Sequence, residues 1–77
     1  MKTIFEIAYL QLPCNFEEDY KNNGFVLNEQ TMEYYKIFDR EIYLNKGDRV
    51  NHVGFHRVAW KCFDIDKDIV TYVLILE

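Results

Sequence analysis

The sequence contains no serine, one proline, three glycines and two cysteines. Without serine, no serine-based nucleophile can be assembled. The glycines, Gly24, Gly47 and Gly54, are scattered along the chain rather than gathered in a phosphate-binding loop. No apolar run approaches the roughly 18 residues of a membrane-spanning helix. These absences exclude serine hydrolases, P-loop nucleotide-binding proteins and helical membrane proteins from the function classes we consider, and we expect no membrane partner.

The two cysteines, Cys14 and Cys62, are too few for a small secreted domain held together by disulfides. They also form no C-x-x-C pair of the kind that begins a zinc site. We therefore predict two reduced, mostly buried thiols. The same reasoning predicts a cytoplasmic protein with no metal and no cofactor.

At 77 residues the chain has room for a single domain, spanning 1–77, with a thin core. Six tyrosines, six phenylalanines and Trp60 supply a large share of its apolar surface. A domain of this size offers little depth for a catalytic cleft, and no nucleophile, base and orienting group stand out by spacing. We therefore expect that the protein is not an enzyme.

Alternating or continuous apolar runs predict strands over 3–12, 25–27, 55–63 and 69–76. Pro13 ends the first of these. Asn15 is predicted to cap a short helix that has acidic residues in its first turn and ends before Gly24. The strongest turn signal of the chain lies over 45–48, and Arg49 and Val50 follow it.

Residues 28–44 are ambiguous. Tyrosines and β-branched residues favour a strand over 32–38, followed by a turn at Asp39-Arg40 and another strand over 41–44. The alternative is a second helix near 28–39. The fold class predicted from all segments is mainly β: a small curled antiparallel sheet or barrel of five or six strands with one short helix. An α+β fold is the alternative if 28–39 is helical.

A regular strand over 55–63 assigns its side chains to two faces by simple alternation. One face then holds His56, Val58, Trp60 and Cys62, and the other holds Phe55, Arg57, Ala59, Lys61 and Phe63. This favours a core position for Trp60, on the opposite side from Arg57 and Lys61. The sequence leaves open whether the aromatic side chains form a core or a binding face.

Charge is distributed in blocks along the chain, whose formal net charge is −4. Residues 14–33 and 63–77 are acidic, whereas cations dominate 45–62. In this basic segment, cations alternate with aromatic and histidine side chains, a mixture that small barrels use to bind single-stranded nucleic acid. The predicted binding residues are Lys46, Arg49, His56, Arg57, Trp60 and Lys61.

Three functional hypotheses follow. The first is a small non-catalytic module that binds a protein partner and forms a homodimer, of a kind typical of phages and mobile elements. The second is a nucleic-acid-binding barrel that uses residues 46–61. The third is an acidic decoy, in which Glu17, Glu18, Asp19, Glu29 and Glu33 inhibit a nucleic-acid-binding enzyme.

Overall fold

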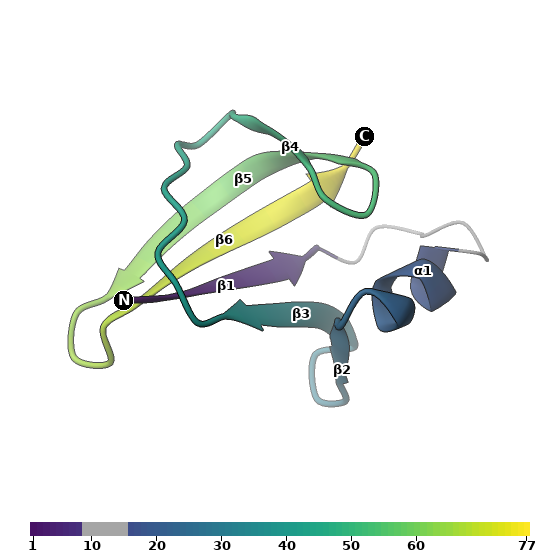
Figure 1. The fold of residues 1–77 in the computed structure, drawn as a ribbon, viewed down its shortest axis with the longest axis horizontal. Helices are drawn as coiled ribbons and strands as arrows, with labels where there is room; N and C mark the ends of the chain where they lie inside the picture. Colours follow the sequence, from purple (N-terminus) through teal and green to yellow (C-terminus); the bar gives the residue numbers. More distant parts are fainter. Residues whose placement is uncertain (9–15) are drawn as a thin grey trace.

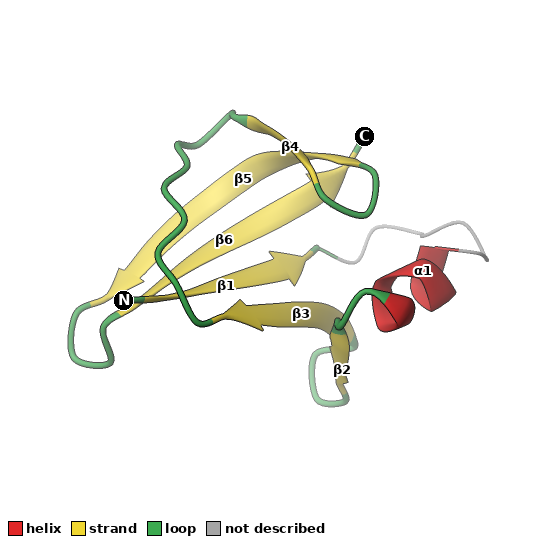
Figure 2. Cartoon of the chain, viewed as in Figure 1, coloured by secondary structure: helices red, strands yellow, loops and turns green. Residues whose placement is uncertain are grey.

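A computed structural model describes residues 1–8 and 16–77 of the chain. Within these residues, six strands form one sheet and one short helix lies beside it (Figures 1 and 2). The elements are β1 (Lys2–Ile7), α1 (Phe16–Asn22), β2 (Val26–Asn28), β3 (Glu33–Phe38), β4 (Arg49–Asn51), β5 (Phe55–Asp64) and β6 (Ile69–Leu76). The predicted mainly β fold with one short helix is confirmed. The predictions for 9–12, Pro13, Cys14 and the Asn15 cap fall outside the described residues.

The sheet order is β2-β3-β1-β6-β5-β4, and the sheet is open rather than closed into a barrel. Its two edges, β2 and β4, are strands of three residues, a length that limits pairing with other chains. The predicted antiparallel pairing holds for four of the five strand pairs of the sheet. It is wrong for the fifth, because β1 and β6 pair in parallel. These strands are the first and last of the chain, so no short turn between them imposes an antiparallel pair.

Residues 33–38 form a strand, so the alternative second helix near 28–39 is wrong. The strand predicted over 41–44 is absent from the structure. Side chains bind the backbone of this segment instead: Ile42 N–H donates to Thr3 Oγ1, and Leu44 N–H donates to Tyr72 Oη, both at 2.9 Å. Because two buried strand residues satisfy its polar groups, the segment crosses the sheet without joining it.

The core lies on one side of the sheet, which we call the inner face. Its fully buried side chains include Phe5, Ile7, Tyr72 and Leu74 from the central strands. The helix α1 covers one part of this face through Tyr20, and the apolar side chains of residues 42 and 44 pack against another part. Glycine at position 24, with φ of 87°, ends the helix in a left-handed conformation.

A bulge interrupts β5 between Val58 and Trp60. Val58 pairs with Leu74 of β6. Trp60 lies two residues further along β5, but it pairs with Val73, which is only one residue from Leu74. The extra residue reverses the alternation beyond this point. Trp60 therefore points away from the core and is 64% exposed, and Cys62 is exposed as well. The predicted core position of Trp60 and the predicted burial of Cys62 are both wrong for this reason.

Candidate binding face of the sheet

The side of the sheet opposite the core, the outer face, carries no helix among the described elements, and only turns at its edges contact it, through Thr31, Lys46 and Gly47. It is formed by the strand residues that alternate with the buried ones. Several of its large apolar side chains are well exposed, with 64% exposure for Trp60, 54% for Ile37 and 47% for Phe55. The outer face comprises Val26, Asn28, Glu33, Tyr35, Ile37, Ile4, Glu6, Thr71, Val73, Ile75, Arg57, Trp60, Cys62, Phe55 and Arg49.

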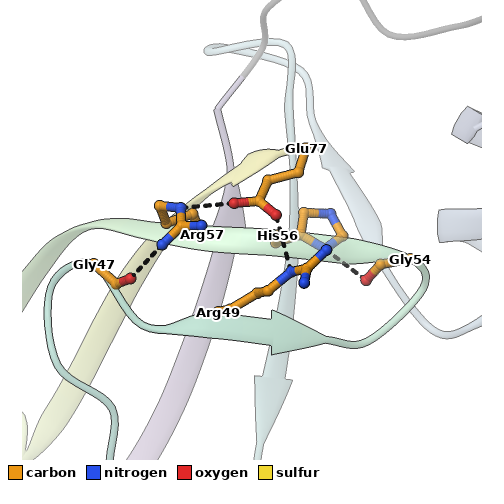
Figure 3. Close-up of polar contacts among 6 residues, drawn as sticks. All are labelled: Gly47, Arg49, Gly54, His56, Arg57 and Glu77. Carbon is orange, nitrogen blue, oxygen red and sulfur yellow. Dashed lines mark hydrogen bonds and ion pairs between the residues drawn. The ribbon is translucent and has the colours of Figure 1, made fainter.

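Cations and aromatic rings gather on the β4–β5 half of this face. Arg57 and Arg49 both bind the carboxylate of Glu77, with Nε–O distances of 2.6 and 3.0 Å (Figure 3). Arg57 also donates to the carbonyl oxygen of Gly47 at 2.9 Å. The guanidinium of Arg49 lies 4.2 Å from the centre of the Phe55 ring. Two guanidinium groups thus share one carboxylate, so this half of the face keeps a positive excess.

Trp60 lies beside this ion-pair cluster. The Lys46 ammonium group is 4.4 Å from the centre of the Trp60 ring, a cation–π distance. Lys46 comes from the turn before β4, so this contact ties the turn to the outer face of β5. The result is a basic-aromatic cluster made of Lys46, Arg49, Arg57, Phe55 and Trp60.

The β1–β3 half of the outer face is acidic. Glu6 and Glu33 line a hollow of about 220 Å³, together with Ile4, Tyr35, Asn28 and Thr31. Burial, and in second place the charge of Glu33, raise the pKa of the Glu6 carboxyl. No cation forms an ion pair with either carboxylate within the described part of the chain. The outer face therefore carries opposite charges on its two halves.

The structure brings together four of the six residues predicted to bind. Lys46, Arg49, Arg57 and Trp60 share the basic-aromatic cluster. Lys61 lies beyond the bulge and points to the inner side, with its ammonium group 3.9 Å from the centre of the Tyr43 ring. His56 is fully buried. The predicted set is thus split between the two sides of the sheet.

His56 belongs to the core rather than to a surface. Its Nδ1–H donates to the carbonyl oxygen of Gly54 at 3.0 Å, so in the neutral ring Nε2 accepts from the Tyr20 hydroxyl at 2.6 Å. Burial lowers the pKa of His56 and raises the pKa of Tyr20 to about 12. The pair is therefore neutral at pH 7, and its role is to satisfy two buried polar groups.

The predicted set of binding residues contains none from the β1–β3 half of the outer face, namely Glu6, Glu33, Tyr35 and Ile37, although the acidic-decoy hypothesis includes Glu33. The alternation along 3–8 shows that Glu6 points away from its apolar neighbours. No pattern in the sequence shows that 33–37 lies beside that strand, because this adjacency depends on the sheet order. A local signal therefore identifies Glu6 as outward-facing, but not its neighbours.

Among the described residues, no helix has the length and apolar character needed to cross a membrane, and no three His, Cys, Asp or Glu side chains converge as a metal site. No protein-family model matches the chain, and no curated protein or solved structure shows significant similarity to it.

Proposed function

We propose that the protein is a small non-catalytic interaction module that binds a protein partner through the outer face of its sheet. One observation carries the proposal: Ile37, Phe55 and Trp60 are about half exposed or more, on a face that no described helix covers. Large exposed apolar patches rimmed by polar groups are typical of interaction sites. Tryptophan, tyrosine and arginine, all present on this face, are the side chains that most often dominate protein interfaces.

A protein partner suits this face better than a nucleic acid does. Lys61 turns to the other side of the sheet, so the predicted basic segment does not present its cations on one face. The acidic half of the face, with Glu6 and Glu33, would repel phosphates. The observation that favours the nucleic-acid alternative is the stack of Lys46 on the exposed Trp60 ring.

The proposal includes a non-catalytic role and a cytoplasmic location. Two buried titratable groups with shifted pKa values, Tyr20 and His56, bind each other in the core, out of reach of a substrate. The cytoplasmic location rests on the low cysteine content, and origin in a phage or mobile element stays a prediction. The acidic-decoy hypothesis depends on the exposed carboxylates of α1, Glu17, Glu18 and Asp19, and it also stays a prediction.

Two matched variants test this function. I37E places a charge on the outer face, whereas I65E makes the same change at the β5–β6 turn, where Ile65 is 89% exposed. The immobilised wild-type chain and both variants are exposed to lysate of host cells that also produce the untagged wild-type chain, half of it treated with nuclease. Bound proteins, further copies of the chain included, are identified by mass spectrometry. Thermal unfolding confirms that each variant is folded.

We expect the wild type and I65E to retain the same proteins with and without nuclease, and I37E to lose them. Equal capture by all three chains would refute the outer face as the binding surface. Loss of capture after nuclease treatment would instead favour the nucleic-acid alternative.

A further inference from the structure

We propose that the partner of the outer face is a second copy of this chain, packed face to face around a two-fold axis that runs along β1 and β6. The inference rests on the proposed function, because it names the occupant of the same surface. A two-fold interface is self-complementary, so the two halves of the outer face must match each other. The sheet order and register allow this match to be examined residue by residue.

The sheet is divided evenly by the boundary between β1 and β6. Three strands lie on each side of it, in the order β2-β3-β1 and β6-β5-β4. A half-turn about an axis along this boundary lays β3 of one copy over β5 of the other, and β1 over β6. Aligned sheets pack about 10 Å apart with strands within about 30° of each other, so residues at equal height along these strands come near one another.

The aromatic residues of the two halves lie at equal height. Tyr35, Glu6, Val73 and Trp60 are successive Cα partners across β3, β1, β6 and β5, so they form one row. The half-turn therefore brings Tyr35 of one copy near Trp60 of the other, and the symmetry repeats this contact. Such pairing would cover the exposed indole ring with another aromatic side chain.

The charged residues of the two halves match two rows further along the strands, beyond one row that faces the core. Tyr34, Ile7, Leu74 and Val58 are successive partners. The row beyond it, toward the end of the sheet where β1 ends, contains Glu33 on β3 and Arg57 on β5. The half-turn therefore brings Glu33 of one copy near Arg57 of the other.

Within one chain, the two arginines of the outer face have only one carboxylate between them, so a contact with a further carboxylate is favourable. Arg49 and Arg57 share the single carboxylate of Glu77, and Glu33 of a second copy would supply another. On the acidic half, the charge of Glu33 adds to the effect of burial in disfavouring ionised Glu6. An arginine from the second copy would relieve that repulsion, so both halves gain from the same contact.

A third row and the size of the face agree with this arrangement. Ile37, Ile4, Thr71 and Cys62 are successive partners, so apolar Ile37 would meet Cys62 of the other copy. The chain measures 36 × 25 × 19 Å, and the view in Figure 1 looks down the shortest of these dimensions. With α1 and the loops included, the two longer dimensions set an upper limit for the outer face, and this limit is of the same order as the roughly 800 Å² per partner of a standard stable interface.

Charge reversal on the two halves tests the arrangement. The variants are E33R and R57E, and the controls E18R and K21E make the same charge changes on α1, on the inner side of the sheet. Sedimentation velocity measures the dimer dissociation constant of each chain alone and of E33R mixed with R57E. In E33R alone both symmetric contacts join like charges, and the same is true of R57E alone. In the mixed dimer both contacts join opposite charges.

We expect a wild-type dimer, at least a hundredfold weaker self-association for each outer-face variant, and recovery of dimer in the mixture. The controls should dimerise as the wild type does. A dimer that neither variant weakens, or no recovery on mixing folded variants, would overturn the arrangement. If R57E does not fold, the wild type still provides a test, because its only tryptophan should show blue-shifted emission as concentration rises.

A wild-type chain that stays monomeric with constant tryptophan emission at high micromolar concentration would also overturn the homodimer. The proposed function fails separately, only when capture from lysate is equal for the wild type, I37E and I65E.

Discussion

Removal of the Tyr20 hydroxyl should destabilise the fold, because it leaves a buried histidine nitrogen without a partner. Tyr20 is fully buried, and its hydroxyl lies 2.6 Å from Nε2 of His56, which is also fully buried. The other ring nitrogen of His56 is engaged by Gly54, so the ring cannot turn to find a new partner without losing that bond. Every buried side-chain polar atom among the described residues now has a hydrogen-bond partner. Y20F would create the first exception.

We expect Y20F to lower the free energy of unfolding by about 1–3 kcal/mol, the cost of leaving a buried polar group unsatisfied. For a chain of this size, that corresponds to a fall in Tm of about 4–8 °C per kcal/mol. Chemical denaturation followed by circular dichroism measures the difference. The control is Y43F, which removes the same atom from a side chain that is 69% exposed and should change stability by less than about 0.5 kcal/mol. Equal stability of Y20F and Y43F would refute the role assigned to the buried pair.

Three further results are expected. The folded-state pKa values of His56 and His52 lie below 6.5, mainly because of burial, so the unfolded chain takes up protons first as the pH falls. The free energy of unfolding should therefore decrease below about pH 6.5, by up to about 1.4 kcal/mol per pH unit for each histidine, and H52Q should reduce this slope in urea titrations. A slope unchanged by H52Q would contradict the shift assigned to that residue. G54A should destabilise the fold more than G47A does. Both glycines have positive φ, but a Cβ at Gly54 would lie 3.1 Å from Phe16 Cζ, whereas a Cβ at Gly47 would meet nothing within 4 Å. Equal Tm values for the two variants would contradict this contact. T3A should lower the Tm, because buried Thr3 both donates to Arg40 O and accepts from Ile42 N–H, and an unchanged melting curve would show that this bridge is dispensable.

Local patterns in the sequence were sufficient to predict most of the secondary structure. The apolar run from 69 to 76 and the alternation of 55–58 correspond to β6 and to the first half of β5. The acidic first turn and Gly24 correspond to α1 and its end. These features depend on residues that are close in the sequence, so they can be recognised without the fold.

The errors concern contacts between distant residues. The parallel pair of β1 and β6 joins the two ends of the chain, and no turn encodes it. The segment over 41–44 has strand-forming side chains, but Thr3 and Tyr72 bind its backbone. The bulge before Trp60 reverses the faces of the second half of β5. That single reversal moves Trp60 from a predicted core position to the outer face, so the candidate site could be predicted only in part.

The most direct test of the outer face as an interface is the mass in solution of the wild type, I37E and I65E, measured side by side at equal high concentration. We predict twice the chain mass of 9.4 kDa for the wild type and I65E, and the single-chain mass for I37E. Equal masses for the wild type and I37E would contradict self-association through this face.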